Sequence, residues 1–235
     1  MEFAISTAKD GVLLVDKPAG WTSFDVVAKI RGQIRAEYTA RGQKATKRQL
    51  KVGHAGTLDP FATGLLVILL GDATKKAGEF LKLDKVYEAT ICLGKTSTTG
   101  DPEGEITEVN DTIPTRDDVQ DVLGRFRGEI TQRPPIFSAI KINGQRAYKL
   151  ARDGKEVEIP ERHVTIHSLE IIDYTYPELK IRTHVSSGTY IRSLAVDIGA
   201  ALGTGAYCSA LRRTCIADWK IESEPSNNDP LSSID

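Results

Sequence analysis

The chain has 235 residues, and its 31 Lys and Arg nearly balance its 32 Asp and Glu, so the formal net charge is −1. This balance argues against a protein that coats nucleic acid over its whole surface. Three cysteines without a C-x-x-C spacing exclude a disulfide framework and a cysteine zinc site. The longest aliphatic run, Leu65–Leu70, is too short to cross a bilayer. Because Met1–Gly11 lacks the pattern of a secretory signal, we expect a cytoplasmic protein without membrane contact.

Positive charge is concentrated in one segment, residues 29–51. This basic arm contains eight basic residues and a single acid, Glu37, which gives a local charge of +7. The stretch 222–235 is an acidic tail with four acids and no base. A basic arm on a nearly neutral body is typical of contact with a polyanion through one face, and a solvated surface loop is the alternative interpretation.

Hydrophobic periodicity and turn residues predict the secondary structure. In chain order we expect a strand at 11–15, a turn at 16–20, a helix behind a Thr22–Asp25 capping box, a polar loop at 38–49, a buried strand at 65–70, a strand at 86–93, a helix from Thr115 toward Phe126, a strand at 179–185 and a helix at 191–202 ended by Gly203. Strands and helices are interspersed without a regular β-α-β period. We therefore expect a single mixed α/β domain of the α+β type.

Signatures of cofactor chemistry do not fit this sequence. Gly94-Lys95-Thr96 resembles part of a phosphate-binding loop, but Ala89 occupies the place of the required glycine. His163 and His167 are four residues apart, yet the residues between them predict a strand, and no carboxylate or cysteine completes a metal set. We expect no cofactor and no metal.

The segment Gly53–Gly64 is the strongest candidate for chemistry, because it combines turn glycines with His54 and the pair Asp59-Pro60. Two interpretations of Asp59 remain open. It is a helix N-cap with proline at the first helical position, or it is a carboxylate presented on a rigid turn as nucleophile or base.

Six motifs in this order resemble those of the TruB family of tRNA pseudouridine synthases. The shared positions span roughly residues 11–215 and are Asp16-Lys17-Pro18-x-Gly20-x-Thr22-Ser23, Gly53–Gly64, Lys85-x-Tyr87, Gly94–Thr96 with Thr98, Asp101 and Gly104, Pro134-Pro135-x-x-Ser138-Ala139-x-Lys141 with Gly144, Tyr148, Ala151-Arg152 and Gly154, and Ser187–Leu194 with Leu211-Arg212-Arg213. Any one short motif is weak evidence, but their common order is specific.

The resemblance implies the pseudouridine-synthase fold, with a central, largely antiparallel mixed sheet flanked by helices and loops and a catalytic cleft across the sheet. It implies a catalytic domain over residues 1–221 with an RNA-gripping insertion at about 125–155. Members of the family usually carry a C-terminal PUA domain. Only about 20 residues follow Arg213, so we expect no PUA domain here.

The resemblance also implies the reaction, the isomerisation of uridine to pseudouridine at position 55 in the T loop of tRNA. Asp59 would be the catalytic carboxylate, Arg192 would pair with it, and Tyr87 would stack on the flipped uracil and take its C5 proton. The residues with implied substrate-binding or supporting roles are His54, Tyr190, Leu211, Lys17 and Asp101, and Arg152 is a further candidate for a phosphate contact. Our hypothesis is that Asp101 orients Arg192, and a solvated loop acid is the alternative.

Two other functions remain open at this point. The chain could be an RNA-binding factor that folds tRNA, or a synthase for a uridine in another RNA. For all three functions we expect an RNA partner. We expect a monomer that needs no obligate protein partner.

Overall fold

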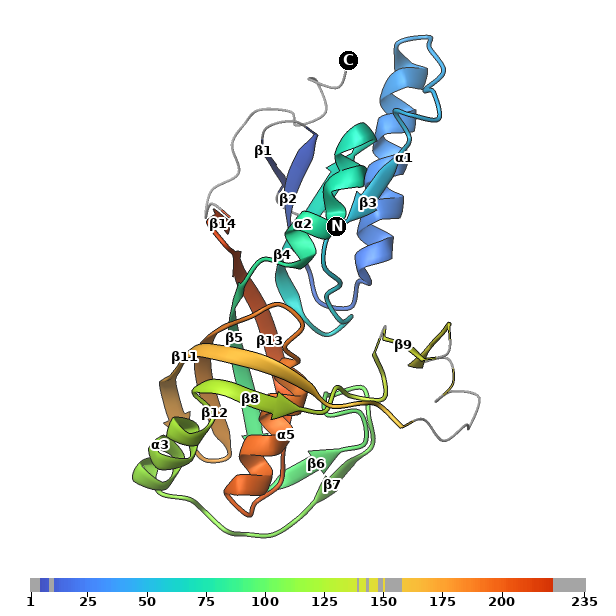
Figure 1. Cartoon of the computed structure of the whole chain (residues 1–235). Coiled ribbons are helices and arrows are strands. Elements are labelled where there is room, and N and C mark those ends of the chain that lie inside the picture. The colour runs from blue at the N-terminus through green and yellow to red at the C-terminus, as the bar shows by residue number, and fades with distance from the viewer. Residues whose placement is uncertain are drawn as a thin grey trace. The chain divides into compact units, whose positions relative to one another are not determined.

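A computed structural model describes residues 5–8, 11–138, 140–142, 144–147, 150 and 158–221 (Figure 1). The chain forms two compact units: the first contains the residues up to Val86 and from Arg212 onward, and the second contains Tyr87–Leu211. The chain passes between the units within strands β5 (Lys85–Leu93) and β13 (Ala206–Ile216). Among the described residues, no helix is both long and apolar enough to cross a membrane.

The first unit is built on an extended sheet. Its strands are β1 (Ile5–Ala8), β2 (Val12–Lys17), β3 (Val52–His54), β4 (Thr63–Leu70), the end of β13 and β14 (Trp219–Lys220). Strand β4 is antiparallel to both β2 and β3 and parallel to β13, with Arg212 opposite Thr63. All of β4 after Thr63 is buried, as expected for a strand that is covered on both faces.

Helix α1 (Ser23–Ala40) begins with the predicted capping box, since the Thr22 hydroxyl accepts from the Asp25 amide and the Asp25 carboxylate accepts from the Thr22 amide. Its apolar positions Val26, Val27, Ile30 and Ile34 are buried. The prediction of a loop from residue 38 onward is wrong at its start, because the helix continues to Ala40. Polar helix formers extend a helix without leaving an apolar pattern in the sequence.

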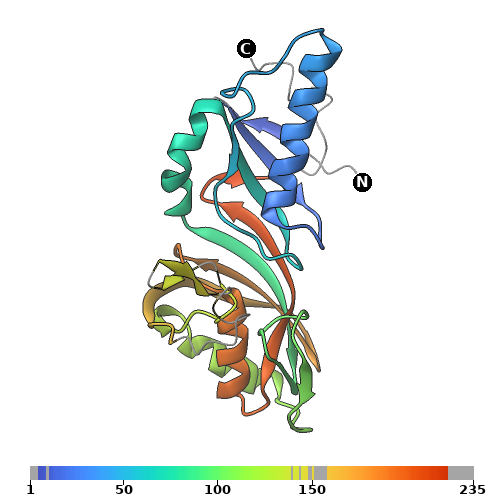
Figure 2. The ribbon, with the colours of Figure 1, turned by 90° about the vertical axis from the view of Figure 1, so that its right-hand side faces the viewer.

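The strands of the first unit lie between α1 and the short helix α2 (Ala77–Leu81) (Figure 2). In one core cluster, alternate residues of β2 and β4 pack against Ala73 of the 3-10 helix η1 (Gly71–Lys76) and Phe80 of α2. The Phe80 ring packs at a tilt against the Trp219 ring, 5.6 Å between centroids. This core keeps the two ends of β4 in place, and the functional loop described below lies at one of them.

The strands of the second unit follow the order β13-β5-β12-β11-β8 within the ten-stranded sheet. The further elements of this unit are β6 (Lys95–Ser97), β7 (Ile106–Glu108), α3 (Arg116–Arg125), β8 (Gly128–Gln132), β9 (Lys141–Ile142), β10 (Gln145–Arg146), β11 (Arg162–Thr175), β12 (Glu178–Val185) and α5 (Ile191–Ala201). Strands β11 and β12 pair antiparallel, as do β11 and β8.

The predicted elements of the second unit are confirmed. Strand β5 alternates buried and half-buried residues along its whole length, helix α3 has the Thr115–Asp118 capping box, and α5 ends before Gly203, whose φ is +71°. The expected class is also confirmed, a mixed α/β fold with a mixed sheet, in which β4 is parallel to β13 and antiparallel to β2.

Several sequence predictions lie outside the described residues. They concern the motif positions Ala139, Tyr148, Ala151-Arg152 and Gly154, and the acidic tail 222–235. The boundaries predicted for the catalytic domain (1–221) and the insertion (about 125–155) stay predictions.

Candidate active site

Asp59 lies in an irregular segment between β3 and β4. After Pro60 the chain enters strand β4 at Thr63, and no helix follows in this stretch. The N-cap interpretation of Asp59 is therefore wrong. The alternative interpretation, a carboxylate on a turn, agrees with the backbone.

The chain is fastened on both sides of Asp59. Before it, the Ser23 hydroxyl accepts from the Leu58 amide at 2.9 Å and donates to the Leu58 carbonyl at 3.2 Å. After it, the Pro60 carbonyl accepts from the Gly20 amide at 2.8 Å. A short segment held at both neighbours of one residue keeps the main chain of that residue in one place, which limits where a reacting carboxylate can reach.

Two buried cations support the same segment. Lys17 is fully buried, and its Nζ donates to the carbonyls of Pro18, Trp21 and Pro60 at 2.9, 2.6 and 3.2 Å. Arg213 is 1% exposed, and it donates from Nε to Leu65 O and from Nη2 to Gly56 O at 2.7 and 3.0 Å. Buried charges are tolerated only when they are well hydrogen-bonded, and here the acceptors are backbone carbonyls of the loop and its neighbours.

Replacing Lys17 by Met should disturb both stability and catalysis. The variant leaves the half-buried carbonyls of Pro18 and Trp21 without this donor, which costs about 2 kcal/mol, and it removes one of the two hydrogen bonds to the Pro60 carbonyl. We expect a lower urea midpoint and a kcat about 10- to 100-fold lower. The matched control is Lys82→Met at an exposed position. A Lys17→Met protein as stable and active as the control would contradict this role.

Gly64 permits close contact between β4 and β13. Its φ is +96°, and a Cβ there would lie 2.3 Å from the Arg213 carbonyl oxygen and 2.9 Å from the Arg213 amide nitrogen. Both atoms belong to the backbone and cannot move aside cheaply.

We expect Gly64→Ala to destabilise the chain by more than about 3 kcal/mol. Gly20→Ala is the matched control, because Gly20 also has a positive φ, +80°, but no atom lies within 4 Å of its added Cβ. That variant should lose only about 1 kcal/mol. Urea unfolding followed by circular dichroism measures both, and equal losses would show that the close contact has no effect.

In the second unit, Arg192 and Asp101 form a buried ion pair. Arg192 Nη1 lies 2.7 Å from Asp101 Oδ2, and both side chains are 4% exposed. Arg192 also donates to the carbonyls of Thr99 and Phe137 at 3.1 and 2.8 Å. The other carboxylate oxygen of Asp101 accepts from the Thr99 hydroxyl and the Glu103 amide. The pair therefore connects α5 with two loops.

Tyr190 immediately precedes α5, and its main chain is held by the buried side-chain amide of Gln132. The Tyr190 amide donates to Gln132 Oε1 at 2.8 Å, and Gln132 Nε2 donates back to the Tyr190 carbonyl at 3.0 Å. The Arg162 guanidinium lies over the Tyr190 ring, 5.3 Å from its centroid. Tyr190 is half-buried, and its contact with the guanidinium is a cation–π interaction.

The remaining candidates lie on strands. Tyr87 and Leu211 are buried on β5 and β13, each 8% exposed, and His54 is half-buried on β3 opposite Ile68. Lys85, two residues before Tyr87, is buried, and its Nζ donates to the carbonyls of Phe80 and Leu81 at the end of α2 and of Leu83 just beyond it. Burial, with repulsion from Arg213 as the smaller cause, lowers the pKa of Lys85 to about 8.

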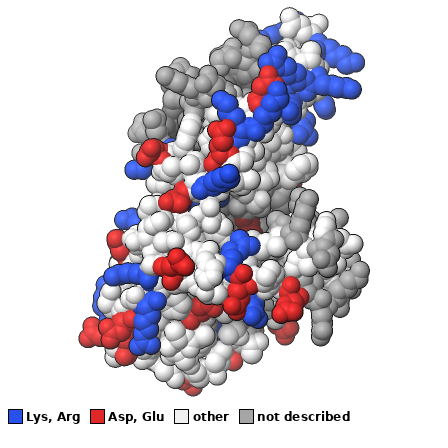
Figure 3. Space-filling view, viewed as in Figure 1, with Lys and Arg blue, Asp and Glu red and all other residues white. Residues whose placement is uncertain are grey.

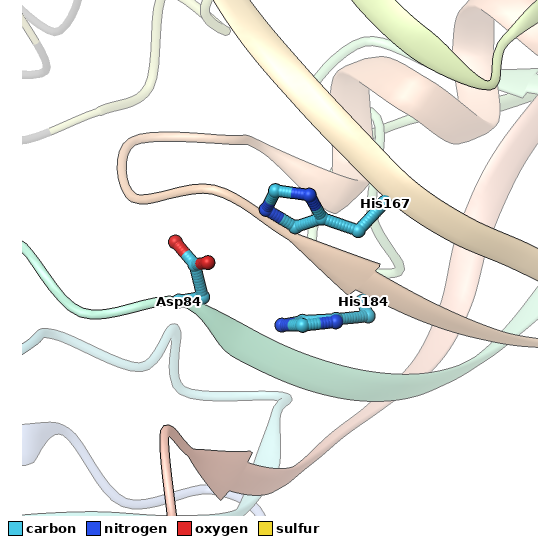
Figure 4. A group of neighbouring side chains, drawn as sticks. All are labelled: Asp84, His167 and His184. Carbon is cyan, nitrogen blue, oxygen red and sulfur yellow. The ribbon is translucent and has the colours of Figure 1, made fainter.

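His163 and His167 lie on strand β11, as the sequence predicts. The ring of His167 packs against His184 and not against His163. The His167 ring lies 4.6 Å from that of His184 on β12, with the two planes tilted (Figure 4). The two strands are out of register by a bulge between Ile166 and Ser168. Asp84, drawn in the same view, belongs to the first unit.

A family model for the TruB family pseudouridylate synthase (N terminal domain) matches residues 43–191. The tRNA pseudouridine synthase B of Phocaeicola vulgatus is 47% identical over 216 residues, which cover 91% of this chain and 89% of that protein. This chain belongs to the TruB family. The tRNA pseudouridine synthase B of Azoarcus sp. strain BH72 is also 47% identical, and the match covers 89% of this chain and 66% of that protein.

Solved structures agree with membership of the TruB family. A chain of a Cbf5–Nop10–Gar1 complex superposes with a TM-score of 0.64 at 30% identity, covering 94% of this chain and 59% of that chain. A chain of an H/ACA RNP bound to a substrate RNA containing 2′-deoxyuridine gives a TM-score of 0.59 at 29% identity, covering 88% of this chain and 47% of that chain.

The structure groups the predicted site residues by unit. Lys17, His54 and Asp59 belong to the first unit, and Tyr87, Asp101, Tyr190, Arg192 and Leu211 belong to the second. Within the units, it brings Lys17 to the Asp59 segment and Asp101 to Arg192. Sequence reasoning missed the contacts of Gln132 and Arg213. Arg213 belongs to the family motif Leu211-Arg212-Arg213, which was a signal for its importance. No motif or pattern in the sequence indicates a role for Gln132.

Proposed function

We propose that this chain isomerises uridine to pseudouridine at position 55 in the T loop of tRNA, with Asp59 as the catalytic carboxylate. The observation that carries this proposal is the Asp59 segment, fastened at Leu58 and Pro60. Two relatives that are 47% identical are named tRNA pseudouridine synthase B.

The reaction adds and removes no atoms overall. The N1–C1′ bond of the uridine breaks, the base turns while it stays bound, and a C5–C1′ bond forms. The hydrogen on C5 is then lost to solvent and N1 gains a proton. Such chemistry needs a carboxylate in one fixed orientation, a group that holds the detached base and a group that takes the C5 proton.

The roles of the other residues follow the family motifs at the matching positions. We propose Arg192 and Tyr87 as the further catalytic groups and His54, Tyr190, Leu211, Lys17 and Asp101 as residues that bind or support the substrate site. A buried arginine held by Asp101 and two carbonyls is preorganised and does not need to be ordered during the reaction. We also propose that the chain acts as a monomer in the cytoplasm. Its target is the T loop of tRNA, whose bases are already partly unstacked.

The test is tritium release from a tRNA transcript that carries [5-³H]uridine. We expect release from the wild-type transcript and none from a transcript in which cytidine replaces uridine 55. Release that persists without uridine 55 would keep the chemistry but move the target to another uridine.

A second candidate function, a synthase for another RNA, is favoured by one observation, the likeness to a chain of an RNP bound to substrate RNA. The same assay with other transcripts distinguishes the two. Binding of tRNA without any release of tritium would instead favour the RNA-folding factor and would exclude the isomerase.

A further inference from the structure

The basic arm has a defined structure in the first unit. The C-terminal half of α1 and the loop behind it carry six exposed basic side chains, which we call the basic surface: Arg35, Arg41, Lys44, Lys47, Arg48 and Lys51. Figure 3 shows Lys and Arg gathered over this end of α1.

The loop that carries the basic surface is fastened at several points. The Thr46 amide and hydroxyl donate to Gln49 Oε1 at 2.8 and 2.9 Å, and the Leu50 amide donates to the Thr46 carbonyl. Arg31 donates from Nε to Leu50 O and from Nη2 to Val52 O, both at 3.1 Å. A loop whose main chain is already fastened loses less freedom when it binds, which favours a binding surface over a loop whose charge serves only solvation.

Most of this charge is not neutralised within the chain. Arg41 pairs with Glu37, and Arg48 pairs with Asp72 at 2.6 Å. Arg35, Lys44, Lys47 and Lys51 have no ion-pair partner among the residues that the structure describes. Four unpaired cations close together on one surface repel one another, and this cost is offset when a polyanion binds.

The lengths of two elements of the first unit, α1 and β4, give an estimate of the distance from Asp59 to the far end of the basic surface. Helix α1 starts at Ser23, which is bonded to Leu58, and its length from Ser23 to Ala40 corresponds to about 25 Å. Strand β4 starts at Thr63 and ends at Leu70, again about 25 Å, and beyond its end the Gly71 amide donates to the Lys51 carbonyl at 2.7 Å.

We propose that the basic surface binds the phosphate backbone of the substrate RNA, about 25 Å from the uridine at Asp59 and without reading its sequence. This inference rests on the proposed function. A DNA duplex has about one phosphate per 1.7 Å of axis and an RNA duplex is somewhat denser, so that 25 Å corresponds to about fifteen phosphates or more. The surface would therefore contact a part of the RNA outside the target loop.

The experiment compares two variants with the same change in charge. The test variant replaces Arg35, Lys44, Lys47 and Lys51 by Gln. The control variant replaces four exposed basic residues elsewhere by Gln: Lys82, Arg116, Lys180 and Lys220. Each is assayed on full-length tRNA and on a short hairpin with the same loop and a stem of three base pairs, which is about 10 Å long.

For full-length tRNA we expect the test variant to lower the slope of log affinity against log salt by about three units and to raise KM about tenfold. On the short hairpin it should match the wild type, because that RNA ends before the basic surface. The control variant should keep the wild-type slope and KM on both RNAs.

An unchanged slope in the test variant, or an equal loss of affinity on hairpin and tRNA, would overturn the inference. So would an equal effect of the control variant, which would reduce the surface to a part of the overall charge. Failure of the proposed function looks different, because then the wild type itself would release no tritium while the salt slopes could still be measured.

Discussion

Asp59→Asn should abolish turnover and leave RNA binding intact. The substitution keeps the shape of the side chain but removes the charge and basicity that the reaction needs, and loss of a single catalytic carboxylate lowers kcat by at least about a thousandfold. Stability should change little, because Ser23, Gly20 and Lys17 fasten the main chain on both sides of Asp59.

The measurement is single-turnover tritium release with saturating enzyme, together with the Kd for tRNA. We expect the Kd to stay within about threefold of the wild type. Asp218→Asn, in an exposed position of the same unit, is the matched control and should be fully active. Turnover by Asp59→Asn within tenfold of the wild type would reject Asp59 as the catalytic carboxylate.

Asp101→Ala should strongly destabilise the second unit. It leaves Arg192 buried, 4% exposed, without its carboxylate partner. An uncompensated buried charge costs about 3–5 kcal/mol, which corresponds to a fall in Tm of about 10 °C for a chain of this size.

A double-mutant cycle separates the ion pair from a simple loss of packing. If the pair is responsible, Asp101→Leu combined with Arg192→Leu should lose less stability than the sum of the two single variants. Asp121→Ala, at an exposed position of α3, is the control and should unfold like the wild type. Additive losses in the cycle would show that Asp101 and Arg192 contribute independently.

Local patterns predicted most of the secondary structure. The alternation in β5 and the two capping boxes depend only on residues close together in the sequence, so they can be predicted without knowledge of the fold. The end of α1 was not, because Tyr38, Thr39 and Ala40 belong to a polar stretch without an apolar period. The position of Asp59 on a turn was predicted only as one of two alternatives, since Asp-Pro starts helices as readily as it shapes turns.

The contacts that support the site could not be predicted in the same way. Lys17 and Arg213 bind backbone carbonyls, and every residue offers a carbonyl, so the sequence does not indicate which ones a buried cation will meet. Gln132 and Tyr190 are 58 residues apart, and their contact depends on how β8 and α5 are placed. The role of Asp101 beside Arg192 was proposed only through the family resemblance.

The Asp59 segment is held through its main chain as well as by its buried side chains Ala55, Leu58 and Ala62. Ser23, Gly20, Lys17 and Arg213 bind amides and carbonyls of the segment. The side chain of Thr57 is exposed and takes no part in these hydrogen bonds. A substitution at Thr57 can therefore change the surface offered to an RNA without moving the carboxylate, whereas the supporting residues outside the segment have little freedom to change.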